Sequence, residues 1–165
     1  MGVYISLDSF RCHVETSDGL GSDEPYMIVA TVDRTAATPI RTFRYGPFAN
    51  VDAQENHLTG FQTIWGMNGE DRLLNNPDDA IFLVCIIEND SDLPDLWSAS
   101  IWQAVSGAFS AVAGLDRPTQ VTRLATAMDR ARPGDGPGAG SDDKVGSPRE
   151  VRFSGAEIRS RLISA

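Results

Sequence analysis

An uninterrupted apolar segment at residues 80–87, AIFLVCII, constrains the fold of this chain more than any other feature of its sequence. The segment has the length and the β-branched residues of a strand, and turn-forming Asn, Pro and Asp residues come directly before it. A strand with one face in water would alternate apolar and polar side chains, and this segment does not alternate. It therefore predicts a strand that is buried on both faces.

Several shorter segments also have strand character, with turn sequences such as Gly46-Pro47 between them. In the first of them the alternation changes parity near Asp8 and Ser9, which indicates a bulge or a break. Many short strands separated by turns are typical of a β-sandwich. The strands that we expect besides residues 80–87 lie at residues 3–14, 26–32, 40–45, 57–65 and 150–153.

The segment at residues 92–132 has the pattern of a helical hairpin rather than of strands. Its first helix contains residues 96–115, which include no charged side chain, and Asp92 is placed to cap it. A second helix with one apolar face is expected at about residues 118–130, capped by Asp116. The Gly-rich residues 133–141 that follow have the composition of a flexible linker.

The uncharged first helix has two apolar stripes, and one packing surface can cover only one of them. We expect Trp97, Ile101 and Val105 to be buried within the chain, and Trp102 and Phe109 to meet a partner or a lipid. Three environments fit this helix: packing on the sandwich or on the second helix, an interface between copies of the chain, or insertion into a membrane. A homo-oligomer would form through residues 96–115.

Acidic residues occur near the ends of several expected strands. Those on the loop before residue 26 repel one another unless a cation lies among them, so a solvated acidic turn and a calcium site are both possible interpretations. Acids after residue 87 would join them if the two strands meet at one end of the sheet. The candidate calcium ligands on these two segments are Asp18, Asp23, Glu24, Glu88 and Asp90.

The acidic segments resemble the calcium-binding loops of C2 domains. In that family an Asp, a Gly/Ser run and Asp-Pro-Tyr open a strand, as residues 18–26 nearly do here. Glu88-Asn89-Asp90 stands in the place of the Asp-x-Asp pair of the family, and the spacing from Asp143 to Gly146 also matches. The resemblance therefore implies that Asp143, or its neighbour Asp142, is a further calcium ligand. The resemblance covers most of residues 3–90 and 141–155, with the hairpin as an insertion.

The resemblance implies one domain over residues 1–165, mainly β, built as an antiparallel C2-like β-sandwich with the inserted helical hairpin. A capping box at residues 154–157 adds a short C-terminal helix. The resemblance also implies that the chain binds Ca²⁺ and attaches in a calcium-dependent way to a membrane surface or a protein partner. The alternative function is a metal-free structural, assembly or membrane-inserting component that uses the hairpin.

Composition and motifs exclude other classes of function. The net charge of −9, from 23 acids and 14 bases, argues against a nucleic-acid partner, since phosphates need a basic surface. No nucleophile motif accompanies His13 or His57, so we expect no enzymatic activity. Cys12 and Cys85 are expected as free thiols. Without a visible signal peptide, the expected location is the cytoplasm, or the exterior by a route that the sequence does not reveal.

Overall fold

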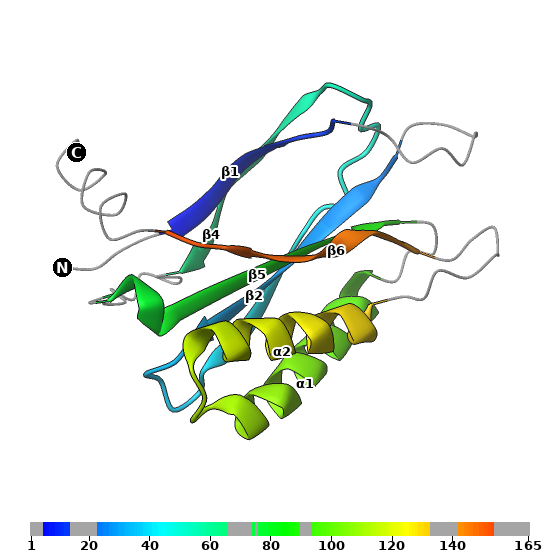
Figure 1. Ribbon diagram of the computed structural model, residues 1–165. Coiled ribbons are helices and arrows are strands. Elements are labelled where there is room, and N and C mark those ends of the chain that lie inside the picture. The colour runs from blue at the N-terminus through cyan, green and yellow to red at the C-terminus, as the bar shows by residue number, and fades with distance from the viewer. Residues whose placement is uncertain are drawn as a thin grey trace, which may run out of the picture.

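The computed structural model describes residues 5–13, 23–65, 74, 76–89, 94–132 and 142–153. It is mainly β, with two antiparallel sheets and two helices (Figure 1). The elements in chain order are β1 (Ile5–Arg11), β2 (Pro25–Asp33), β3 (Ile40–Tyr45), β4 (Asn56–Trp65), a short 3₁₀ turn η2 (Pro77–Asp79), β5 (Ala80–Glu88), α1 (Pro94–Val112), α2 (Arg117–Ala131) and β6 (Asp143–Val151).

The larger sheet has the strand order β3-β2-β5-β6, and each strand is antiparallel to its neighbours. The smaller sheet pairs β1 with β4, and its register shifts between Leu7 and Ser9, which confirms the bulge expected there. β5 lies between β2 and β6, so its backbone is paired on both sides. β3 and β6 are the edge strands of the larger sheet.

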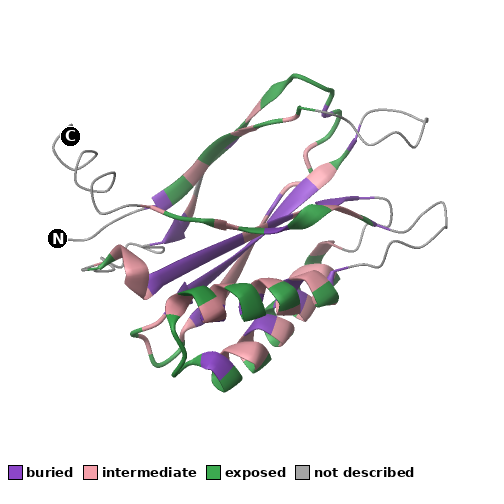
Figure 2. Ribbon diagram, viewed as in Figure 1, coloured by how far each residue is buried: buried purple, intermediate pink, exposed green. Residues whose placement is uncertain are grey.

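The larger sheet is covered on both faces, which explains why β5 contains no polar residue before Glu88. On β2, the even-numbered residues from Tyr26 to Val32 belong to the core beneath the helices, whereas Val29 belongs to the core beneath β1 and β4. On β5, Leu83 faces the helices and Phe82 faces the smaller sheet. Figure 2 shows these two strands as the buried centre of the molecule. The fold therefore has three layers, in which the larger sheet lies between the smaller sheet and the helical hairpin.

Both expected helices are present between β5 and β6. Ile101 and Val105 of α1 are fully buried against the sheet, as expected, and Trp97 packs on the same core while remaining partly exposed. The carboxylate of Asp116 accepts a hydrogen bond from the Thr119 backbone N–H at 3.0 Å, which caps α2 as predicted.

Gln120 fastens the turn between the two helices. Its fully buried side chain donates from Nε2 to the carbonyl oxygens of Val112 and Ala113 at 3.0 and 2.9 Å, and its Oε1 accepts from Arg34 Nε at 2.8 Å. The carbonyl of Val112, the last residue of α1, thus accepts from this side chain as well as from the Leu115 N–H at 2.9 Å. The contact with Arg34 also ties the hairpin to the segment that connects β2 and β3.

The last strand differs from the expectation. β6 runs over Asp143–Val151, so residues 143–146 are part of the sheet and not of a loop, and the strand begins well before residue 150. Pairing of Lys144 with Ile87 and of Val145 with Ile86 holds this segment in the sheet. The linker at residues 133–141 and the helix expected from residue 154 lie outside the described residues.

Candidate functional site

The larger sheet brings three acidic segments to the same end. Glu88, the last residue of β5, pairs with Pro25 on one side and with Asp143 on the other. Asp23 and Glu24 directly precede Pro25, and Asp142 directly precedes Asp143. The described acids of the predicted calcium site therefore lie on three adjacent segments at one end of the sheet, which we call the acidic end.

The acidic side chains at this end differ in exposure. Asp23, Glu88 and Asp142 are buried, whereas Glu24 and Asp143 are exposed. The Asp23 backbone is held by a bridge to Val51, whose N–H donates to the Asp23 carbonyl oxygen at 3.0 Å. These contacts fix the backbone of the first acidic segment against the loop that precedes β4.

Asp142 has a buried hydrogen-bond partner. The hydroxyl of Tyr26, on β2, donates to Asp142 Oδ2 at 2.8 Å, and both residues are almost completely buried. Burial, reinforced by this hydrogen bond to the carboxylate, raises the pKa of Tyr26 well above its ordinary value. The bond therefore connects the inner strand β2 to the residue that precedes β6.

Within the described part of the chain, no group of three or more His, Cys, Asp or Glu side chains is arranged to hold an ion. Asp18 and Asp90, the remaining predicted ligands, lie outside the described residues. Asn89, next to Glu88, has a buried amide oxygen without a hydrogen-bond partner. The calcium site remains a prediction, supported by the approach of the backbone segments.

The opposite end of the sheet carries an ion-pair network that sequence reasoning did not anticipate. Asp78 lies 2.8 Å from Arg152 Nη2 and 3.6 Å from Arg117 Nε, while Arg117 Nη1 lies 2.5 Å from Glu150 Oε1. The hydrogen bond from Arg152, with the nearby Arg charges, lowers the pKa of Asp78. Because this network joins the 3₁₀ turn, α2 and β6, its role is to hold the hairpin on the sheet.

His57 and Cys85 have packing roles. The His57 ring stacks on Phe10 with centroids 5.2 Å apart, and its Nε2 lies 3.3 Å from Glu55 Oε2. Cys85 is buried, as expected for a core thiol, whereas Cys12 is only partly buried. Burial raises the pKa of Cys85 to about 12, so this thiol stays protonated at neutral pH.

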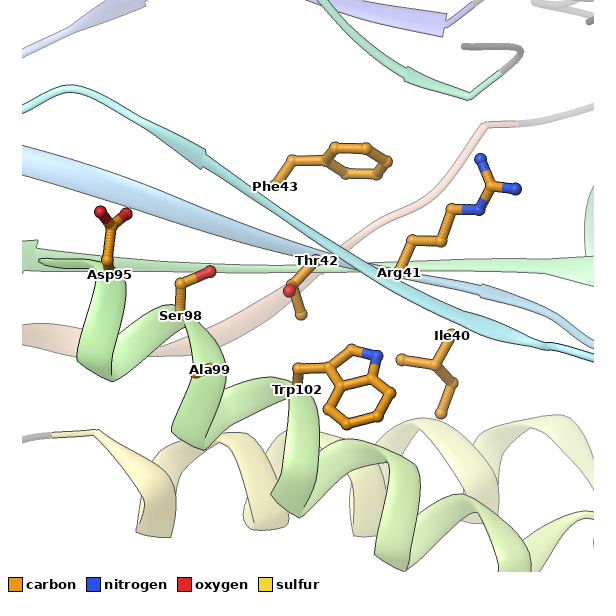
Figure 3. Close-up of a pocket in the computed structure, with 8 residues that line it drawn as sticks. All are labelled: Ile40, Arg41, Thr42, Phe43, Asp95, Ser98, Ala99 and Trp102. Carbon is orange, nitrogen blue, oxygen red and sulfur yellow. The ribbon is translucent and has the colours of Figure 1, made fainter. Parts of the chain in front are cut away.

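A groove runs between α1 and the edge strand β3, and we call it the α1–β3 groove. It has a volume of about 530 Å³ and opens beside the uncharged surface of the helix (Figure 3). The small side chains of Ser98 and Ala99 leave space between the helix and the strand. The residues that line the groove are Ile40, Arg41, Thr42, Phe43, Asp95, Ser98, Ala99 and Trp102.

Trp102 is the largest apolar side chain in this groove. It is 46% exposed, and Figure 3 shows its ring beside Ile40. Ile40 pairs with Val32, at the end of the sheet away from Glu88. The exposure of Trp102 agrees with the expectation that it meets a partner or a lipid. Trp102 lies at the end of the sheet away from the acidic end. Phe109, expected on the same exposed side, is partly buried and packs on the core beneath the helices.

The groove carries charge at both ends. Arg44 Nε lies 2.9 Å from Asp95 Oδ1, so the first turn of α1 is tied to β3 by an ion pair. Arg41, at the Trp102 end, forms no ion pair with the part of the chain that the structure describes. The sequence pattern identified Trp102 but not the groove, because nothing in the sequence indicates that β3 is an edge strand beside α1.

Comparison of the chain with protein-family models, with curated proteins and with solved structures gave no match. The family assignment to C2 domains therefore has no support beyond the sequence motifs and the coarse sandwich arrangement. Among the described residues, no helix is long and apolar enough to cross a membrane.

Proposed function

We propose that this protein is a non-catalytic binding module that associates with another protein through the α1–β3 groove. The observation that carries this proposal is the half-exposed Trp102 beside an open sheet edge. Trp is among the residues that most often dominate the binding energy of protein interfaces, because its large ring excludes water from a partner surface.

The outer surface of α1 supports a protein partner. No charged residue follows Asp95 in this helix, and Leu96 on its outer side is 56% exposed. The neighbouring helix α2 behaves as a solvent-facing helix should, with Arg123 and Arg130 exposed. Depletion of charge is typical of the centre of an interface, so the difference between the two helices favours a partner on α1.

Site-specific photo-crosslinking tests this proposal. A photoreactive amino acid at position 102 should capture discrete partner species in cells that express the protein. The matched control is the same amino acid at Leu58, which is 81% exposed on β4, in the other sheet. Identical crosslinked species from both positions, or none from position 102, would contradict the proposal.

A lipid surface is the competing partner for Trp102. Binding of Trp102→Ala and wild-type protein to anionic vesicles, with and without calcium, distinguishes the two. Trp102→Ala is the appropriate variant because Phe109 packs on the core, so a change at Phe109 would also disturb the fold. Calcium-dependent vesicle binding that this variant loses would favour the membrane over a protein partner.

Calcium binding at the acidic end is a second candidate function, within a C2-like module. It is supported by the register that places Glu88 between Pro25 and Asp143, and by the buried amide oxygen of Asn89. Carbonyl and carboxylate oxygens are the ligands that Ca²⁺ prefers. Asp18 and Asp90 would complete the set on this proposal.

Thermal unfolding with and without calcium tests whether calcium binds to the folded protein. A ligand at a hundredfold excess over its Kd stabilises the folded state by about 2.7 kcal/mol, so millimolar calcium should raise the melting temperature. Asp23→Asn should remove most of the rise. Asp8→Asn, which makes the same charge change at an exposed position on β1, should keep it. An unchanged wild-type melting temperature would exclude a functional calcium site.

A further inference from the structure

We infer that the α1–β3 groove binds an extended peptide of another protein as an additional strand on β3, with an acidic residue opposite Arg41 and an apolar residue against Trp102. This inference rests on the proposed function and specifies how the partner binds. Addition of a strand to an open sheet edge obtains affinity from backbone hydrogen bonds and specificity from alternate side chains.

The register of β3 identifies the backbone groups that a peptide would meet. The Asp33 N–H donates to the Pro39 carbonyl oxygen at 2.7 Å, so Asp33 and Pro39 form a hydrogen-bonded pair that continues the register of β2 and β3. Along an antiparallel ladder, hydrogen-bonded pairs alternate with pairs that are not hydrogen-bonded. Thr31 and Arg41, two residues further along each strand, are therefore the next hydrogen-bonded pair. The N–H and C=O groups of Arg41, Phe43 and Tyr45 therefore point toward β2.

It follows that the backbone groups of Ile40, Thr42 and Arg44 point away from β2, toward the groove. Among the described residues, no backbone–backbone hydrogen bond outside the strand pairing reaches these groups. The groove thus contains donors and acceptors at every second residue along the six-residue strand, which is the arrangement that an added strand needs.

The side chains around the groove determine which residue types should alternate along the peptide. Ile40 and Thr42 face the helix side of the sheet, with Trp102, whereas Arg41 and Phe43 point to the other side of β3 (Figure 3). Successive side chains of an extended peptide also point to opposite faces. One face of the peptide would contact Trp102 with an apolar residue, and the other would meet Arg41.

Charge selects the residue that faces Arg41. Asp95 already pairs with Arg44, and Arg41 has no carboxylate partner in the described part of the chain. Among the described residues Arg41 is therefore a positive charge without an ion-pair partner, in a protein whose net charge is −9. A Glu or Asp directly opposite it on the added strand would form a favourable cross-strand pair, and a Lys would be repelled.

A pairing of β3 with β3 of a second copy fits this edge less well than a peptide with an acidic residue does. The sequence of β3 is IRTFRY, with two Arg residues and no acid. In a symmetric antiparallel pairing of two β3 strands, Arg41 would stand opposite Arg41, Phe43 or Tyr45 of the other copy, depending on the register. Each of these registers leaves Arg41 without a carboxylate, and two copies with the same net charge also repel one another.

Short synthetic peptides that alternate Val and Thr, with one Glu placed at each position in turn, provide the probe. Fluorescence polarisation should show one Glu position that binds about threefold to fivefold more tightly than the same peptide with Lys. Arg41→Glu should reverse this preference. Trp102→Ala should weaken binding of every peptide about tenfold.

Thr42→Pro tests the backbone contacts. Proline removes the Thr42 N–H, which points outward, and edge strands tolerate proline at such positions, so the pairing of β3 with β2 should persist. Peptide binding should be lost, and Thr42→Val, which keeps the N–H, should retain it. If Thr42→Pro fails to fold, hydrogen exchange decides instead, since a bound peptide should protect the amides of Ile40, Thr42 and Arg44.

The results separate this inference from the proposed function. Photo-crosslinking at position 102 together with unchanged peptide binding by Thr42→Pro would refute strand addition and leave the binding module in place. A wild-type dimer in solution that Thr42→Pro converts to a monomer would replace the peptide with a second copy of the chain. Absence of a Glu preference at every position would overturn the role assigned to Arg41.

Discussion

The buried hydrogen bond between Tyr26 and Asp142 should be one of the strongest individual contacts in the fold. Tyr26 lies in the middle layer on β2, and its hydroxyl donates to Asp142 Oδ2 at 2.8 Å, where Asp142 is 1% exposed. The two residues are 116 positions apart in the chain. Tyr26→Phe keeps the aromatic ring and removes only the hydroxyl, so it measures this bond with little change in packing.

A hydrogen bond to a charged group contributes about 1.5–3 kcal/mol to stability. We therefore expect Tyr26→Phe to lower the free energy of unfolding by about 1.5–3 kcal/mol. Urea denaturation at pH 7, with the slope of the transition held common to both proteins, measures this difference.

The pH dependence gives a second, independent check. Burial and then the hydrogen bond raise the pKa of Tyr26 in the folded protein, while the phenol of the unfolded chain titrates near its ordinary pKa of about 10. The stabilisation is therefore complete below about pH 10 and is lost as the pH rises above it. The stability difference between wild type and Tyr26→Phe should decrease by about 1.4 kcal/mol for each pH unit above that value.

Tyr45→Phe is the matched control. The hydroxyl of Tyr45 donates to a neutral acceptor, the Thr63 carbonyl oxygen, at 3.3 Å, so its removal should lower the free energy of unfolding by only about 0.5–1.5 kcal/mol. If Tyr26→Phe destabilises the protein no more than Tyr45→Phe does, the contact between Tyr26 and Asp142 does not have the strength that its geometry indicates.

Three further predictions concern the hairpin and the thiols. Gln120→Ala should lower the free energy of unfolding by about 2–3 kcal/mol in urea denaturation, because it removes the three hydrogen bonds that this buried side chain makes with Val112, Ala113 and Arg34. Asp116→Ala should lower the melting temperature at pH 7, and the difference from wild type should shrink as the pH falls below about 4, since hydrogen bonds from Thr119 lower the pKa of folded Asp116 and the stabilisation is lost as the pH falls through this lowered pKa. A thiol reagent at pH 8 should modify the partly exposed Cys12 in the native protein and the buried Cys85 only after unfolding, and equal labelling rates would contradict the burial of Cys85.

The sequence by itself determined the elements and the inner surface of the fold. β-branched runs and turn residues are local signals, so the strands from β1 to β5 lie close to their predicted positions, and the apolar segment before Glu88 is buried on both faces. The same applies to the hairpin, where helical spacing identified Ile101 and Val105 as buried residues. Each of these features depends on the residues within one element and on the period of that element.

Only the tertiary structure decided which elements became neighbours. The pairing of β6 with β5 placed Asp143 in a strand, although its sequence resembles a loop, because hydrogen bonding to a distant strand outweighs local preference. The strand order made β3 an edge, and the hairpin then formed a groove against it beside Trp102. Strand order and helix placement depend on contacts between residues far apart in the chain, and the pattern of one segment carries no information about them.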